Sequence, residues 1–156
     1  MSALARTPLR KKRPGKPRRV LQECSVGRCK RRADQAMCKT HAQQKADSLF
    51  AAHIRARGRC EVASWFPKVE CRGALQCSHI VSRRYHAIRW SEGNAVSSCA
   101  AHHLYTTNHP MEWEVAVNER HYIPFDTFRL HALRDSIPDP LDVIESLAPS
   151  EGEPDD

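Results

Sequence analysis

The spacing of apolar residues predicts one long helix in the first half of the chain. Residues 43–57, QQKADSLFAAHIRAR, contain neither glycine nor proline, and the residues near one face at helical spacing are Ala46, Leu49, Phe50 and Ile54. Gly58 follows at the position where a glycine commonly ends a helix. We therefore expect a helix over 43–57 that packs its apolar face on the residues that come after it.

Short apolar runs separated by turns follow this helix. The run ALQCSHIV, residues 74–81, favours a strand, and a hairpin over about 60–80 is the pairing that the sequence suggests. Residues 94–107 have the pattern of a turn that enters a helix. This part of the chain is therefore expected to combine a small sheet with a helix.

Two more helices are predicted nearer the C-terminus. Pro110 is suited to the first turn of a helix, PMEWEVAVNER, with Asn108 or His109 as its cap. A last helical piece covers 125–133. Together, these elements predict a small α+β fold.

Charge is distributed unevenly along the chain. Residues 1–20 hold eight Lys and Arg, three prolines and no acid, whereas residues 135–156 hold eight acids and no Lys or Arg. Such segments bury too little apolar surface to fold, so we expect a disordered basic arm and a disordered acidic tail. The total charge is +7, but the 134 residues before the tail carry +15, which favours nucleic acid as a partner.

The seven cysteines require an explanation. The N-terminus has no apolar segment of the kind found in secretory signals, and no run approaches the ~18 apolar residues that a membrane span needs. Without export, disulfides are disfavoured and metal ligation is the better explanation for the cysteines. We therefore expect a cytoplasmic protein that binds metal and has no membrane partner.

The first cysteine cluster has the spacing of a zinc knuckle. CSVGRCKRRADQAMCKTH supplies Cys24, Cys29, Cys38 and His41, four ligands that suit tetrahedral Zn²⁺. A Cys and a His three residues apart can reach one ion from a single helical turn. We predict a knuckle over 21–42, in which zinc provides most of the folding free energy.

A second structural zinc site can be built further along the chain. Cys60, Cys71, Cys99 and His102 form a Cys3His set that would join the predicted hairpin to the following helix. The ten residues between the first two cysteines exceed the usual knuckle spacing, so Cys77 is a rival ligand. One or two zinc ions are therefore expected in all.

Three further residues suit the hydrolysis of a phosphodiester. That reaction needs a base to activate water and a cation near the scissile phosphate. His79 has a suitable pKa for the base, and His103 can ligate a divalent ion. Asn94 can either hold the His79 ring in one tautomer or position its loop.

This order of residues resembles the HNH nuclease motif. His79, Asn94 and His103, with a Cys-x-x-His pair directly before the last histidine, are most similar to phage and bacterial members that contain His-Ile-x-Ser-Arg, as SHIVSR does here. The resemblance covers about residues 58–115. It implies a ββα-metal core stapled by zinc, with His79 as general base, Asn94 in the loop and His103 on a divalent cation.

Two positions depart from the family pattern. Many members carry Asp or His directly before the base as a second metal ligand, and this chain has Ser78. A further family ligand, one turn after the last histidine, would fall at Thr107. Hydroxyl groups are poor ligands for Mg²⁺. A catalytic Mg²⁺ or other divalent ion would therefore depend mainly on His103.

We predict a metal-dependent HNH endonuclease that hydrolyses DNA, with its nuclease domain over 43–134. The resemblance favours phage or mobile-element DNA processing, in the host cytoplasm if the protein is phage-encoded. The alternative is a non-catalytic, zinc-dependent DNA-binding or regulatory protein on the same scaffold, and a basic arm also permits RNA. Guanidinium groups suited to phosphate come from Arg83, Arg84 and Arg89.

Overall fold

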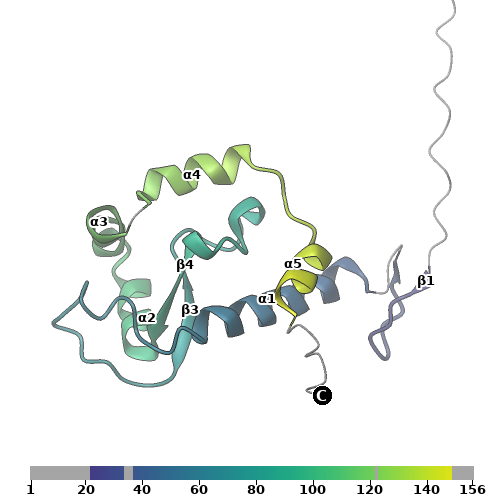
Figure 1. Cartoon of the computed structure of the whole chain (residues 1–156), viewed down its shortest axis with the longest axis horizontal. Helices are drawn as coiled ribbons and strands as arrows, with labels where there is room; N and C mark the ends of the chain where they lie inside the picture. The colour runs from purple at the N-terminus through teal and green to yellow at the C-terminus, as the bar shows by residue number, and fades with distance from the viewer. Residues whose placement is uncertain (1–21, 34–36, 122, 149–156) are drawn as a thin grey trace, which may run out of the picture. The chain divides into compact units, whose positions relative to one another are not determined.

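A computed structural model describes three stretches of the chain, residues 22–33, 37–121 and 123–148 (Figure 1). The basic arm predicted over 1–20 lies outside these residues, as does the end of the predicted acidic tail, 149–156. The chain divides into two compact units, with the boundary between Cys38 and Lys39. The described residues form α-helices and two small antiparallel sheets, which confirms a small α+β fold.

The first unit contains a very short hairpin. Strands β1 (Gln22–Glu23) and β2 (Arg32–Ala33) pair antiparallel. The backbone N–H of Cys24 donates to the carbonyl of Arg31 at 3.1 Å, which extends the pairing by one step. Arg28, in the connecting turn, has a positive φ of 64°. This turn brings the chain back on itself between Cys24 and Cys38.

The second unit begins with helix α1 (Lys39–Arg55), which starts four residues before the predicted helix. Gly58 has φ +71° and its N–H donates to the carbonyl of Arg55 at 3.0 Å, so the prediction that this glycine ends the helix is confirmed. The buried side chains recur at every fourth residue, as one helix face requires. They are Ala42, Ala46, Phe50 and Ile54.

The main sheet is a hairpin that the sequence did not reveal. Strand β3 (Leu75–His79) pairs with β4 (Ala95–Cys99), so the hairpin predicted over 60–80 is wrong. Residues between 60 and 74 form turns. They bond to β4 through the N–H of Glu61, 2.8 Å from the Ser97 carbonyl, through the Glu61 carboxylate, 2.7 Å from the Ser97 N–H, and through the Cys60 sulfur. The partner strand AVSSC is too short and too rich in serine to give a strand signal.

Three helices follow the hairpin directly. They are α2 (Ala100–Asn108), α3 (Pro110–Arg120) and α4 (Phe125–Arg134). The helix predicted to begin at Pro110 is confirmed, with His109 at its cap position, and so is the helical piece over 125–133. None of the helices in the described ranges has both the length and the apolar character to cross a membrane.

Part of the predicted disordered tail is a helix. Within residues 135–156, α5 (Pro140–Leu147) is capped by the Asp139 carboxylate, which accepts from the N–H of Leu141 at 2.9 Å. Helix α5 packs along α1 (Figure 1), and Leu147 packs against the buried cluster around Phe50. The prediction of disorder relied on the high average acidity of the tail and overlooked the short apolar run PLDVIESL, which packs on α1.

Two hydrophobic cores lie on opposite faces of the β3–β4 hairpin. Because successive side chains of a strand point to opposite faces, Ala95 joins a small core with Phe50 and Ile54 of α1, whereas Val96 joins the large core. The large core unites the loops on both sides of β3 with α3 and α4. Its buried members are Val62, Phe66, Ile80, Val81, Ile88, Val96, Trp113, Ala116, Val117 and Phe128.

Truncating the small core should destabilise the protein strongly. Ile54 is completely buried, so Ile54→Ala should lower the free energy of unfolding by roughly 2–5 kcal/mol. Ile137 is 68% exposed, so Ile137→Ala should change the free energy of unfolding by less than about 0.5 kcal/mol. Urea denaturation of both variants with zinc present tests this, and equal losses would contradict the burial described here.

Candidate functional site

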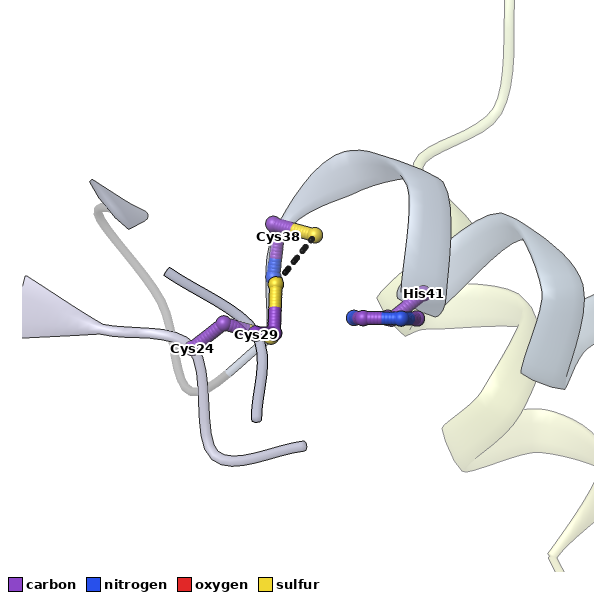
Figure 2. A group of neighbouring side chains, drawn as sticks. All are labelled: Cys24, Cys29, Cys38 and His41. Atoms are coloured by element: carbon purple, nitrogen blue, oxygen red, sulfur yellow. Dashed lines mark hydrogen bonds between the residues drawn. The ribbon is translucent and has the colours of Figure 1, made fainter. Parts of the chain in front are cut away.

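The knuckle residues gather into one cluster. Their sulfur and imidazole atoms lie within 4.8 Å of one another (Figure 2), and the residues are Cys24, Cys29, Cys38 and His41. Figure 2 shows the His41 ring, in the first turn of α1, turned toward the cysteines. The N–H of Cys38 donates to the Cys24 sulfur at 3.2 Å and lowers the pKa of that thiol. Three thiols and an imidazole at this spacing fit tetrahedral Zn²⁺.

A second cluster of the same composition lies at the junction of β4 and α2. It contains Cys60, Cys71, Cys99 and His102, whose ligand atoms also lie within 4.8 Å of one another. Two ligands come from the turns before β3, one ends β4 and one lies in the first turn of α2. The cluster therefore joins the turn segment to the hairpin and helix, as the sequence predicts for a structural zinc.

The imidazole of His102 is oriented for metal binding. This ring is completely buried, and its Nε2–H donates to the carbonyl of Phe66 at 3.4 Å. Its Nδ1 therefore faces the sulfurs, 3.0 Å from Cys99 and 3.7 Å from Cys71. A ring nitrogen that donates to a carbonyl while the other faces a metal position is the usual arrangement at zinc histidines.

Cys77, the rival ligand, is not part of this group. Its side chain packs against the small core beside α1. Burial raises the pKa of the Cys77 thiol to about 11, which opposes the thiolate form that metal binding needs. Among the described residues, the structure thus selects Cys60 and Cys71 as the partners of Cys99 and His102.

Cys71 and Cys99 of the second cluster differ in how readily their thiols ionise. Burial opposes ionisation of Cys99, but its hydrogen bonds with His102 outweigh this and lower the pKa of Cys99 to about 6. Burial, together with the neighbouring Cys60 and Cys99, raises the pKa of Cys71 to about 11. A divalent cation would offset this repulsion, so the donor set fits zinc and binding should release protons.

Gly73 allows the turn segment to approach the helix. It has φ +78°, and a Cβ placed there would lie 2.8 Å from the Cβ of Ala100. The carbonyl of Arg72 accepts from the N–H of Ala101 at 3.1 Å, which ties the turn to the first turn of α2. A side chain at Gly73 would therefore strain the backbone and force the turn and the start of α2 apart. The sequence signal for this turn is the glycine in CRG, residues 71–73.

His79 is the last residue of β3 and is partly buried. Its ring lies 5.9 Å from the ring of Phe50, and its Nε2–H donates to the carbonyl of Arg89 at 3.0 Å. A carbonyl can only accept, so Nε2 carries the proton and Nδ1 is left as an acceptor. Burial lowers the pKa of His79, so the ring is neutral at neutral pH.

Asn94 fastens the loop that follows His79. It is completely buried, and its Oδ1 accepts from the N–H of Val81 at 2.8 Å. Its Nδ2 donates to the carbonyls of Val81 and Ile88 at 3.0 and 3.1 Å. Of the two roles that the sequence left open for Asn94, these hydrogen bonds correspond to positioning the loop.

His103 lies on α2 and contacts the other side of β3. Its Nδ1 is 2.6 Å from the Oγ of Ser78, which also bonds to the Oγ of Ser98. Burial lowers the pKa of His103 as well. The Thr107 hydroxyl donates to the His103 carbonyl at 2.8 Å. Ser78 and Thr107, the two positions that depart from the family pattern, thus both bond to His103.

The three arginines expected to bind phosphate differ in their surroundings. Arg83 and Arg84 are exposed, and the charge of Arg83 adds to burial in lowering the pKa of both His79 and His103. Arg89 is only 11% exposed, and its guanidinium is bound to the carboxylate of Asp47. Arg89 therefore has a structural partner. Sequence reasoning missed Asp47 because a single acid on a helix gives no signal.

Comparisons with protein-family models, with curated proteins and with solved structures find nothing that matches this chain.

Loss of a ligand should be measurable as loss of zinc. We expect Cys71→Ser to weaken one of two zinc sites by more than the roughly 10–100-fold typical of an outer-shell change. Cys77→Ser is the matched control and should retain wild-type zinc content. Elemental analysis and chelator competition measure both, and equal zinc loss in the two variants would contradict the assignment.

Arg83 should control the titration of both histidines. Removing its positive charge in Arg83→Gln should raise the pKa of His79 and of His103, because protonation no longer occurs beside a cation. Arg84→Gln removes a neighbouring exposed charge and should leave both values unchanged. Histidine NMR titrations distinguish the two variants. An unchanged pKa in Arg83→Gln would place Arg83 away from both rings.

Proposed function

We propose that the chain is a metal-dependent HNH endonuclease that hydrolyses DNA, in phage or mobile-element DNA processing. The order of elements supports this, because a short hairpin, β3 and β4, leads directly into helix α2. His79 ends the first strand, Asn94 precedes the second and His103 lies on the helix. A ββα-metal site would require its three motif residues at these places.

The observation that carries the proposal is the state of His79. Its Nε2–H is held by a main-chain carbonyl, its Nδ1 remains an acceptor, and burial keeps the ring neutral. A neutral imidazole in one fixed tautomer is what a general base needs to take a proton from water. Asn94 fixes the loop that carries that carbonyl, so it acts as a positioning residue.

His103 is the residue that would hold the catalytic cation. Its Nδ1 is occupied by Ser78, so Nε2 is the nitrogen left for a metal. When bound, a divalent ion there would stabilise the charge that develops on the phosphate and the leaving oxygen. The protein supplies no carboxylate among the described contacts of His103, which favours a weakly held ion.

Basic groups near the histidines suit the DNA backbone. Arg83 and Arg84 are exposed in the loop after β3, and their guanidinium groups can bind phosphate. The basic residues of 1–20 would add affinity without sequence preference. In this proposal the zinc knuckle and the arm increase the affinity for DNA, and the histidine site cleaves it.

One observation favours a second candidate, a non-catalytic zinc-dependent protein that binds DNA. At the two positions where family members carry extra ligands, the Ser78 hydroxyl bonds to the His103 ring and the Thr107 hydroxyl donates to the His103 main-chain carbonyl. Such a protein would keep the zinc-stapled scaffold and bind DNA without cutting it. The two candidates differ in one measurable property, metal-dependent cleavage.

Cleavage of supercoiled plasmid tests the proposal. Wild type should convert it to nicked or linear DNA at low salt with Mg²⁺, Mn²⁺, Ni²⁺ or Zn²⁺, and not with EDTA. His79→Ala should lose this activity by roughly 10²–10⁴-fold, the usual contribution of a general base. His86→Ala removes an exposed histidine of the same loop and should cleave as wild type does.

Zinc content and plasmid retardation on a gel serve as controls for the variants. Retardation without cleavage under any ion would support the non-catalytic candidate. Equal cleavage by His79→Ala and wild type would exclude His79 as the base.

A further inference from the structure

An enclosed ion pair connects α1 to the loop after β3. The Asp47 carboxylate accepts from Nε and Nη2 of Arg89 at 2.7 and 2.6 Å, a bidentate arrangement. It also accepts from the indole N–H of Trp90 at 2.9 Å. The side chains are 22% and 11% exposed, so this pair is largely removed from water.

Arg89 is the same residue that holds His79. Its main-chain carbonyl accepts from the His79 Nε2–H at 3.0 Å, while its Nη1 donates to the carbonyl of Arg83 at 2.9 Å. The guanidinium is therefore fixed by Asp47 on one side and by the loop backbone on the other. The anchored side chain of Arg89 therefore also fixes the position of the Arg89 carbonyl.

Two anchors hold this part of the loop. Asn94 binds the carbonyl of Ile88, and Asp47 binds the side chain of the next residue, Arg89. Asn94 lies next to β4, whereas Asp47 lies on α1, outside the hairpin and helix that carry the proposed chemistry. The orientation of His79 thus depends on an element that precedes the proposed nuclease core in the sequence.

We propose that Asp47 is a positioning residue for His79. By holding the Arg89 guanidinium, it keeps the Arg89 carbonyl on Nε2 and leaves Nδ1 as the ring nitrogen that can accept a proton. A catalytic role for this positioning rests on the proposed function. The effect of Asp47 on the orientation of the His79 ring does not depend on it.

The charge of Asp47 is what makes the arrangement stable. A guanidinium that is 11% exposed and has lost its carboxylate is an uncompensated, largely buried charge. Arg89 would then move its side chain to water, and its main-chain carbonyl would leave the His79 ring. The imidazole would be free to exchange between its two neutral tautomers.

Nitrogen-15 NMR of the histidine rings in the zinc-loaded full chain tests this directly. Wild-type His79 should show one neutral tautomer, protonated on Nε2. Asp47→Asn keeps the shape and removes the charge, and it should give a mixture of both tautomers. Glu92→Gln is the matched control, because this carboxylate also bonds to α1, through His53 at 3.0 Å, but makes no contact with Arg89 in the described structure. It should leave the His79 spectrum unchanged.

Two more variants keep the test decisive. Asp47→Glu retains the charge and should restore the Nε2–H tautomer in part. Arg89→Lys retains a cation but loses the bidentate contact, and it should give the mixture even if Asp47→Asn does not fold. A single Nε2–H tautomer in Asp47→Asn, or in Arg89→Lys where the first variant is unfolded, would overturn the proposal. So would a wild-type His79 protonated on Nδ1.

Cleavage assays separate this proposal from the proposed function. If wild type cuts DNA, Asp47→Asn should lower the single-turnover rate on the order of 10- to 100-fold with unchanged DNA affinity, as expected for a misplaced base. An unchanged rate with an unchanged tautomer would overturn the positioning role. If wild type does not cut DNA, the nuclease proposal fails, and the tautomer measurement still decides the role of Asp47.

Discussion

The register of the β3–β4 hairpin is the constraint on which the rest of the second unit depends. His79 lies opposite Ala95, and this pairing directs Cys77 and His79 toward α1, while Ser78 bonds to Ser98 of β4 and to His103 of α2. A slip of one residue would exchange the two faces. Val96 would then leave the large core, and the cysteine that ends β4 would leave its cluster. Asn94, buried beside the start of β4, fixes this register from the loop.

Much of this arrangement is predictable from the sequence. The periodic apolar residues of α1, the proline at the start of α3 and the spacing of the knuckle ligands are local patterns, and the structure contains all of them. The second Cys3His set is also predicted, although its ligands lie far apart in the sequence. What could not be predicted depends on tertiary contacts. Strand β4 forms because it pairs with β3, and α5 forms where it can pack on α1. The importance of Asp47 appears only once the fold brings it to Arg89, 42 residues away.

Helix α1 links features that the sequence presents as separate. His41, in its first turn, belongs to the knuckle cluster, whereas Asp47 and Phe50, further along, contact Arg89 and the His79 ring. A helix that served only as a connection would not need the contacts that Asp47 makes with Arg89 and Phe50 makes with His79. Because α1 also packs on β3 and α5, its displacement would disturb the small core and the histidine together. This packing is the physical basis for the positioning role proposed for Asp47.

The polar residues buried in and beside the hairpin are the strongest argument that it serves a function. Ser78, Ser98 and Asn94 are almost completely buried. Ser78 bonds to both Ser98 and His103, and Asn94 bonds to the backbone of the loop. The Oγ of Ser97 has no hydrogen-bond partner among the described residues. Burying a polar group without a partner is costly, so alanine at Ser97 would make a more stable strand. A hairpin that carries this cost next to two neutral histidines is better explained by a site than by packing.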